Sequence, residues 1–554
     1  MTNRAKDLIQ SRSSKLDRIR TMGIDPYPSF FRRTHSNAEV LTMLSKTETN
    51  APQKTHGEVT VAGRITNIRY MGKASFMDIQ DISAPLQIYV RQDMLGGKYD
   101  MLKELDLGDF IGVTGEAFLT KTEAPTIAAS TLVILSKSLR PPPEKWHGLR
   151  DVEQRYRHRE ADLLSNSDTR ARFILRSKII QAIRTFLDAR DFIEVETPVM
   201  LSVAAGAMAT PFITHHNALD RTLYMRIATE LHLKRCIIGG LEKVYEIGRV
   251  FRNEGLDANH NPEFTTLESY QSYADYLVVM ETFEAMIAQV MSSVLGTTKI
   301  PWKETVLDFN PPWQRLDLRA TIKNFSGIDL EAYSNPVSLS NRMRSLGITV
   351  TQEVSWGRLV DKLISETIEP QLLQPTFIID YPVEMSPLAK RKPDDPDYTQ
   401  RFEAFAGGME IANAFSELND PNEQRNRFAQ QEQLRKEHDS EEFDRLDEDF
   451  LEALEYGMPP TGGLGMGIDR LVMLLSNQPT IREVVLFPHL SRSQAELFRE
   501  ITQRLEELTR DQESDSLESL IERLKKVLPL EIGQRVTDEE LHGRVTAFLS
   551  SQDK

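Results

Sequence analysis

Three consecutive prolines, Pro141, Pro142 and Pro143, divide the sequence into two parts with different patterns. Three fixed φ angles in a row, without amide donors, cannot continue a strand. The run therefore predicts a stiff spacer and a domain boundary.

The part before the prolines has the pattern of a small β-domain. Short β-type runs punctuated by glycines fall at 59–65, 75–79, 86–90, 110–113 and 131–135, with a helical stretch near 92–105. Five such strands with one helix predict a closed barrel of the oligonucleotide-binding kind (OB-fold) over residues 58–143. Residues 1–57 precede it as a helical arm, since apolar residues recur there at helical spacing.

The part after the prolines mixes helical and β-type patterns. An amphipathic helix is predicted over 173–187 and a strand over 377–381, without βα units at regular spacing. An α+β domain with a largely antiparallel sheet is therefore expected over 150–490. Residues 491–554 hold ten Lys or Arg and fourteen Asp or Glu, with leucines at helical spacing, and predict a separate helical tail.

Composition narrows the class of protein. A hydrophobic content of 40% with 27% charged residues indicates a globular chain, and the single cysteine, Cys236, excludes an internal disulfide. No apolar stretch approaches the length of a membrane span, and the charged N-terminus does not resemble a signal peptide. A net charge of −15 argues against wholesale coating of nucleic acid but leaves room for a local basic or stacking surface. We therefore expect a soluble cytoplasmic protein that has no membrane partner.

Three glycine-containing segments bear on nucleotide binding. Neither Gly72-Lys73 nor Gly97-Lys98 is followed by Ser or Thr, which excludes a P-loop. The run 462–467 lacks the order of a dinucleotide-binding turn and leads into a helix opened by Arg470. By itself the run fits close packing of a strand on a helix as well as a nucleotide site, because glycines permit close approach in both.

A second segment places an arginine, carboxylates and aromatic rings close together. Strand alternation predicts that Val250, Arg252 and Glu254 share a face, with Phe264, Glu268 and Tyr270 beside them on a returning strand. A guanidinium suits a phosphate, and a ring suits a base. The alternative is a surface salt bridge between Arg252 and one of the two glutamates.

In sequence order, segments 173–198, 248–270 and 462–475 resemble motifs 1, 2 and 3 of the class II aminoacyl-tRNA synthetases. The first is a helix running into a strand that stops at Pro198. Over nearly all of residues 1–490 the chain is similar to the lysyl-tRNA synthetase family, subclass IIb, bacterial type. The shared stretches include 25–28, 145–149, 211–217, 252–255 and 415–421.

The resemblance implies an ATP-dependent ligase that joins L-lysine to tRNA(Lys) through a lysyl-adenylate, with AMP and pyrophosphate as products. It assigns catalytic roles to Arg252 and Arg470. The implied ATP-binding set is Arg252, Glu254, His260, Phe264 and Arg470. Glu403 and Glu410 resemble the ligands of Mg²⁺, which prefers such hard oxygen donors; without the family they would be ordinary acids on a strand.

A pocket for lysine must satisfy a buried ammonium group with carboxylates and other acceptors, whereas a pocket for aspartate would need basic groups. By resemblance, Glu417 and Tyr270, with Glu268 beside them, receive the ε-ammonium group. Gly206 and Glu230 would hold the α-amino group, and Asn413 would lie next to the carboxylate. The alternatives are that Glu230 is a helix-surface acid and that Glu417 caps a helix.

In the barrel, Arg69, Phe76 and Gln87 match the anticodon-reading residues of the family. An aromatic platform stacks an unpaired base while polar groups read its edge. The alternative places Phe76 in the barrel core, because the strand register is open. Motif 1 forms a two-fold interface in this class, so a homodimer is expected.

The sequence departs from the family at several positions. Asn259 replaces a common arginine of the motif 2 loop, and Thr210 replaces the familiar arginine before Pro211. Thr229 and His232 flank Glu230 in place of the usual Pro and Tyr. These departures leave open a catalytically impaired paralogue that acts as a binding or regulatory module. A lysyl transferase to a protein would usually lack the barrel, and an aspartate or asparagine ligase is disfavoured by Glu417.

Overall fold

The computed structural model describes residues 3–46, 57–143, 149, 151–207, 209–350, 355–438, 446–509, 517–528 and 535–552. The chain divides into two compact units, Met1–Ser167 and Asp168–Lys554. Of the stretch 145–149, only Leu149 is among the described residues.

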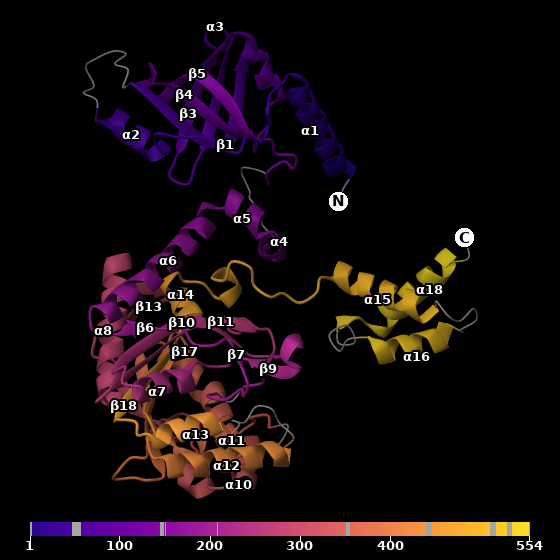
Figure 1. Ribbon diagram of the computed structural model, residues 1–554. Helices are drawn as coiled ribbons and strands as arrows, with labels where there is room; N and C mark the ends of the chain where they lie inside the picture. Colours follow the sequence, from indigo (N-terminus) through magenta and orange to yellow (C-terminus); the bar gives the residue numbers. More distant parts are fainter. Residues whose placement is uncertain are drawn as a thin grey trace. The chain divides into compact units, whose positions relative to one another are not determined.

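The first unit is built around a closed five-stranded barrel with the strand order β1-β2-β3-β5-β4 (Figure 1). Its strands and helices are α1 (Asn3–Thr21), α2 (Asn37–Ser45), β1 (Glu58–Met71), β2 (Ala74–Gln80), β3 (Pro85–Arg91), α3 (Gln92–Leu95), the 3₁₀ helix η1 (Gly96–Glu104), β4 (Phe110–Leu119), β5 (Pro125–Ser136), α4 (Val152–Arg157) and α5 (Arg159–Ser165). The five predicted strands and the intervening helical stretch are confirmed. Alternate residues of each strand fill the barrel; Met77 and Ile79 of β2, for example, are buried.

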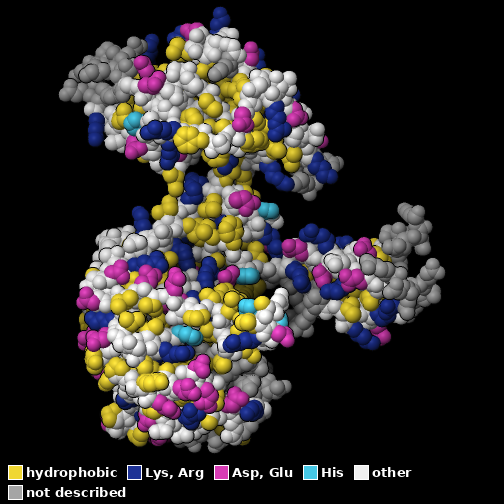
Figure 2. Space-filling model, in the orientation of Figure 1, with side chains coloured by type: hydrophobic (Ala, Val, Ile, Leu, Met, Phe, Trp, Pro, Cys, Tyr) yellow, Lys and Arg dark blue, Asp and Glu magenta, His cyan; other side chains and the backbone are white. Residues whose placement is uncertain are grey.

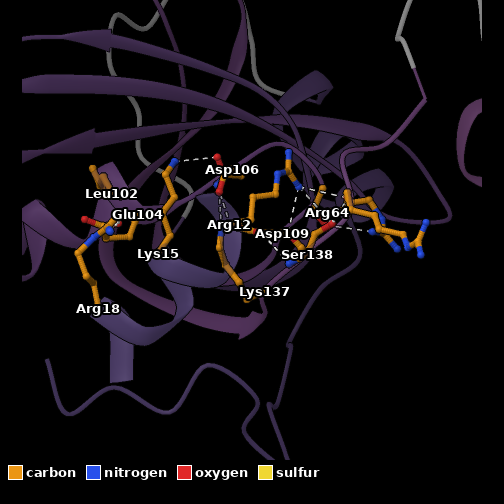
Figure 3. A network of polar contacts seen from close by, with 12 residues as sticks. Arg12, Lys15, Arg18, Arg64, Leu102, Glu104, Asp106, Asp109, Lys137 and Ser138 are labelled. Atoms are coloured by element: carbon orange, nitrogen blue, oxygen red, sulfur yellow. Dashed lines mark hydrogen bonds and ion pairs between the residues drawn. The ribbon is translucent and has the colours of Figure 1, made fainter. Parts of the chain in front are cut away.

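A polar network joins helix α1 to the barrel (Figure 3). The ammonium group of Lys137 lies 2.5 Å from Asp106 and 2.8 Å from Asp109, and the Lys137 and Asp109 side chains are both fully buried. Lys15 of α1 reaches the other oxygen of Asp106 at 2.7 Å. Burial alone would raise the pKa of Asp106, but the hydrogen bonds from Lys137 and Lys15 lower it below its ordinary value. The network therefore depends on an ionised carboxylate between two lysines.

The second unit contains an eight-stranded sheet with the order β14-β15-β16-β17-β18-β11-β10-β6. Its strands and helices are α6 (Ser167–Asp188), β6 (Ile193–Glu194), β7 (Met200–Leu201), β8 (Ile213–His216), β9 (Arg221–Met225), α7 (Glu230–Ile238), β10 (Lys243–Phe251), β11 (Glu263–Ser272), α8 (Tyr276–Leu295), β12 (Lys299–Trp302), β13 (Thr305–Asp308), β14 (Gln314–Asp317), α9 (Leu318–Ser326), α10 (Pro336–Ser345), α11 (Trp356–Leu363), β15 (Thr376–Pro382), β16 (Tyr398–Ala406), β17 (Met409–Ser416), α12 (Pro421–His438), α13 (Glu448–Glu455), β18 (Thr461–Gly467) and α14 (Ile468–Leu475). Short 3₁₀ or π turns are η2 (Asn217–Leu219), η3 (Leu330–Tyr333), η4 (Ile364–Ile368), η5 (Glu369–Gln371), η6 (Val383–Met385) and η7 (Ile481–Glu483).

The sheet is antiparallel from β15 to β10, and only its two edge strands, β14 and β6, pair in parallel with their neighbours. The predicted α+β class with a largely antiparallel sheet is confirmed. Helices α6, α8 and α14 bury their apolar faces against one side of it in a single core. Helix α8 is long and apolar enough to span a membrane by length and composition, but its buried residues Phe283, Ile287 and Val290 belong to this core. The functional residues are therefore left to the other side of the sheet.

Two local predictions are wrong. The strand expected to run up to Pro198 is limited to Ile193 and Glu194, the two residues that pair in register with β10. Strand β10 ends at Phe251, so Arg252 and Glu254 lie in the loop that follows and do not share a strand face with Val250. Val250 is buried instead, and its register partner is Phe264.

The helical tail consists of α15 (Gln494–Thr509), α16 (Leu517–Val527) and α18 (Asp538–Gln552), drawn in yellow tones in Figure 1. Their leucines form a small core of their own, in which Leu520 and Leu524 are fully buried. On the visible face of the protein, acidic and basic side chains are interspersed rather than gathered by sign (Figure 2). The net charge of −15 therefore does not collect into one acidic face in this view.

Candidate functional site

A cavity of about 440 Å³ lies over strands β11, β17 and β18 of the second unit. It brings together every site residue that the sequence predicted in this unit. They are Gly206, Glu230, Arg252, Glu254, His260, Phe264, Glu268, Tyr270, Glu403, Glu410, Asn413, Glu417 and Arg470. Residues more than 260 positions apart in the sequence thus line one enclosed space.

Strand periodicity explains how two of the strands contribute. Along β11, Phe264, Glu268 and Tyr270 are separated by even numbers of residues and all line the cavity. The glycine run on β18 alternates in the same way. A Cβ atom added at Gly462 would lie 2.5 Å from Val279 of α8, whereas one added at Gly463 would lie 1.9 Å from a carboxylate oxygen of Glu417. The run therefore serves both purposes considered from the sequence: one glycine packs on a helix and the next leaves room for the site.

One end of the cavity carries basic groups. The Arg252 guanidinium lies 5.2 Å from the centre of the Phe264 ring. Arg470 donates to the backbone carbonyl of Glu410 at 2.8 Å and lies 3.2 Å from its carboxylate. Its other terminal nitrogen lies 3.0 Å from Nε2 of His260. Since Asp257 accepts from Nδ1 of His260 at 2.7 Å, Nε2 is free to accept from Arg470. The loop after β10 and helix α14 thus meet at a cationic surface suited to phosphates.

Glu403 and Glu410 lie on the adjacent strands β16 and β17 and both line the cavity. One oxygen of Glu403 accepts from Arg401 at 2.6 Å and the other from Tyr381 at 2.7 Å. Burial raises the pKa of Glu403, while Arg401 opposes the rise. Among the described residues, no three acidic, histidine or cysteine side chains form a preassembled metal site. Two carboxylates in a cavity fit Mg²⁺, which is commonly held by one or two carboxylates together with substrate phosphates.

The opposite end of the cavity is acidic. Glu268 accepts from the Thr229 amide at 3.0 Å and lies 3.3 Å from the Tyr270 hydroxyl. Burial raises the pKa of Glu268 to about 7 and that of Tyr270 well above its ordinary value. Glu230 begins helix α7, and Gly206 lies beside it, with its Cβ position 3.6 Å from that of Glu230.

Glu417 is 1% exposed, and burial raises its pKa well above the ordinary value. Its Oε1 atom has no hydrogen-bond partner among the residues that the structure describes. A buried carboxylate oxygen without a partner costs free energy, so it marks a position where a cationic ligand would be stabilised. Glu230, at 7% exposure, is likewise not a helix-surface acid.

Two charged residues that the sequence reasoning missed, Arg401 in the cavity lining and Lys234 beside it, contact predicted groups. Arg401 donates to Oδ1 of Asn413 at 3.1 Å as well as to Glu403, so it joins two predicted groups. Its position two residues before Glu403 on a strand was the available signal. Lys234 is fully buried between Glu230 and Glu417, and its signal was the four-residue spacing from Glu230 on a helix.

The three barrel residues lie on neighbouring strands of the first unit. Arg69 of β1 is the register partner of Phe76 of β2, and Gln87 lies on β3. Phe76 is half-buried and its ring lies 4.8 Å from that of Tyr89, whereas the residues on either side of it point into the barrel. The structure therefore places Phe76 on the outer surface and not in the core. Gln87 accepts a hydrogen bond from Thr126 at 3.0 Å.

Comparisons with known proteins identify the families to which both parts of the chain are similar. Residues 151–491 match the family described as tRNA synthetases class II (D, K and N), and residues 59–135 match the OB-fold nucleic acid binding domain. The chain is 53% identical over 479 residues to a lysine–tRNA ligase of Dehalococcoides mccartyi, covering 86% of this chain and 96% of that protein. It is 51% identical over 483 residues to the lysine–tRNA ligase of Moorella thermoacetica and 50% identical over 485 residues to that of Bacillus subtilis. Each alignment covers 87% of this chain and 97% of the relative.

Proposed function

Because the chain belongs to the lysine–tRNA ligases, within the class II tRNA synthetases, we propose that its cavity carries both steps of the family reaction. That reaction is the ATP-dependent joining of L-lysine to tRNA. In the first step the lysine carboxylate attacks the α-phosphorus of ATP and pyrophosphate leaves. In the second, the 3′-terminal ribose hydroxyl of the tRNA attacks the lysyl-adenylate and AMP leaves.

The choice of lysine is supported by the acidic end of the cavity, and this observation carries the proposal. Glu417, Tyr270 and Glu268 receive the ε-ammonium group, with the unpartnered Oε1 of Glu417 as its main acceptor. Glu230 and the Gly206 backbone hold the α-amino group, and Asn413 lies next to the carboxylate. A ligand with an acidic side chain would instead face three carboxylates, which is strongly unfavourable in a buried pocket.

ATP occupies the other end. Arg252 binds the α-phosphate and the lysine carboxylate, which brings the two reacting groups together and neutralises charge as the pentacovalent centre forms. Phe264 stacks on adenine, Glu254 accepts from the adenine amino group, and His260 and Arg470 bind the distal phosphates. Most of the chemistry is positioning, since no covalent intermediate with the enzyme is needed.

Glu403 and Glu410 would hold Mg²⁺, which would supply positive charge to offset the charge of the phosphates. Around them, Arg401 fixes Glu403 and Arg470 fixes Glu410 through the contacts given above. These arginines hold the two carboxylates in place before a metal binds, so that fewer rotamers are lost when it does.

The first unit selects tRNA(Lys). Phe76 offers a partly exposed ring for one anticodon base, and Arg69 and Gln87 read base edges beside it on the neighbouring strands. The anticodon can then be recognised by stacking and a few directed contacts, so an acidic chain does not need a strongly basic surface to bind it. A cytoplasmic location is part of the proposal, because tRNA and ATP are both available there.

We further propose a homodimer. The segment after α6 exposes large apolar side chains next to Pro198: Ile193 is 48% exposed, Val199 40% and Met200 57%. Such a group is unfavourable in water and suits an interface with a second copy. Sedimentation analysis would show a mass twice that of the 63.2 kDa chain if the proposal holds.

Lysine-dependent exchange between ATP and pyrophosphate is the direct test of the first step. We expect exchange with lysine and none with aspartate or asparagine, and we expect Arg252→Ala to abolish it. Exchange that is absent with every amino acid in a folded protein would overturn the proposal. Charging of tRNA(Lys) then tests the second step separately.

A further inference from the structure

Lys234 is a buried cation in contact with two carboxylates, Glu230 and Glu417, that line the acidic end of the cavity. It lies one helical turn after Glu230 on α7, and its side chain is fully buried. Its ammonium group lies 2.6 Å from Oε1 of Glu230 and also contacts Oε2 of Glu417. The rings of Phe415 and Phe450 lie 5.6 and 5.9 Å from the same nitrogen. The protein thus places one of its own ammonium groups between two of the carboxylates that face the substrate.

Electrostatics keep this lysine charged. Burial alone lowers the pKa of Lys234, but the two carboxylates outweigh burial and raise it above the ordinary value. For Glu230 and Glu417, burial raises the pKa and Lys234 is the strongest opposing influence. The ammonium group therefore favours the ionised form of both glutamates, which is the form that binds a cationic substrate.

The contacts also divide the two oxygens of Glu417 between different tasks. Oε2 contacts Lys234, while Oε1 lies toward Gly463 and the Tyr270 ring and has no partner among the described residues. A carboxylate held at one oxygen has fewer orientations available, so its second oxygen is preorganised for a ligand.

Charge balance leads to the same conclusion. Glu230, Glu268 and Glu417 carry three negative charges when ionised, and Lys234 cancels one of them. The remaining two match the α- and ε-ammonium groups of lysine, whose carboxylate faces Arg252 at the other end. Without Lys234 the pocket would hold one carboxylate too many, and burial would favour its protonation.

We propose that Lys234 is a positioning and specificity-determining residue of the lysine site: a built-in counter-ion that holds Glu230 and Glu417 in place and sets the pocket to accept two ammonium groups. The inference rests on the proposed function of the cavity. The groups that face Glu417 are Lys234 and Glu230 from α7, together with Glu268 and Tyr270 from β11. Arg401 from β16 additionally acts on Glu230.

The test is Lys234→Met in the full-length enzyme, because methionine keeps a linear side chain and removes the charge. The KM for lysine and the KM for ATP would be measured by pyrophosphate exchange between about pH 6.5 and 8.5, where free lysine keeps both ammonium groups largely protonated. We expect the lysine KM of the variant to rise at neutral pH. As the pH rises and the pocket of the variant releases one proton, its lysine KM should fall by up to about tenfold per pH unit. This fall should occur at pH values where the wild-type KM no longer changes. The ATP KM should stay close to that of the wild type.

Lys137→Met is the matched control. Lys137 is also fully buried between two carboxylates, Asp106 and Asp109 (Figure 3), but it belongs to the first unit and is not among the residues that line the cavity. The Lys137→Met variant should be less stable than the wild type, but the pH dependence of its lysine KM should not change.

The outcomes separate the hypotheses. The proposal would be overturned if Lys234→Met had the wild-type KM for lysine. It would also be overturned if the KM values for lysine and ATP both rose and the lysine KM kept the pH dependence of the wild type. If Lys234→Met does not fold, Lys234→Arg decides: with its charge kept, its lysine KM should rise but follow the wild-type pH dependence, and a profile displaced to higher pH would refute the counter-ion role. A wild-type enzyme without lysine-dependent exchange would instead refute the proposed function.

Discussion

Gly463 on β18 offers a sharp test of the lysine pocket. An added Cβ atom would lie 1.9 Å from Oε1 of Glu417 and 2.6 Å from the Tyr270 ring. The oxygen contact is about 1 Å shorter than such atoms tolerate, so the Glu417 carboxylate must move in the Gly463→Ala variant. Displacing it weakens a charge-assisted hydrogen bond to the substrate, which contributes about 1.5–3 kcal/mol, or about 10- to 150-fold in the lysine KM. The ATP KM should change little, because the phosphate end lies elsewhere in the cavity.

The neighbouring Gly465 supplies a matched control on the same strand. A Cβ atom there would lie 3.8 Å from the Asn413 carbonyl and 4.0 Å from the Glu268 side chain, which are ordinary contacts. Gly465 also lines the cavity, but its added Cβ atom would leave the Glu417 carboxylate in place, so Gly465→Ala should change the lysine KM less than Gly463→Ala. Both variants would be assayed by pyrophosphate exchange, with circular dichroism to confirm folding. A folded Gly463→Ala enzyme with the wild-type lysine KM would refute the assignment of Glu417 Oε1 as the substrate acceptor.

Three further predictions follow from the charges and exposures described above. Because burial raises the pKa of Glu268 to about 7, this group is protonated at lower pH, and the lysine KM should fall as the pH rises from about 6 to 8. The Glu268→Gln variant should lose that pH dependence. An unchanged pH profile in the variant would contradict the role of Glu268. Lys137→Met leaves Asp109 buried without its lysine, while Asp106 keeps Lys15, and it should destabilise the barrel by about 3–5 kcal/mol in urea unfolding, whereas equal stability would show that the network contributes little. Phe76→Ala should raise the KM for tRNA(Lys) while leaving pyrophosphate exchange intact, and a loss of exchange would place Phe76 in a different role.

Local patterns predicted much of the fold because they depend on neighbours in sequence. Period-two alternation located the barrel strands, and the same alternation on β11 correctly grouped Phe264, Glu268 and Tyr270. It failed where a strand stops: nothing in the sequence marks Phe251 as the last residue of β10, and Arg252 and Glu254 reach the cavity from a loop. For Phe76 the pattern allowed two registers, and only pairing with Arg69 and Tyr89 selected one.

Lys234 shows why the charge state of a site is harder to predict than its membership. From the sequence, Glu230 and Lys234 are an ordinary helical pair at i and i+4, a pattern that usually indicates a solvated surface. Its meaning changes only because the fold brings Glu417, about 180 residues further along the chain, to the same ammonium group. The sequence allowed each of the three acids to be inferred separately as a group that binds a cation. It did not allow the net charge of the pocket to be inferred, because that charge depends on which buried lysine the fold places between the acids. The number of cationic groups that the pocket accepts is therefore a tertiary property, and the pH dependence of Lys234→Met measures it directly.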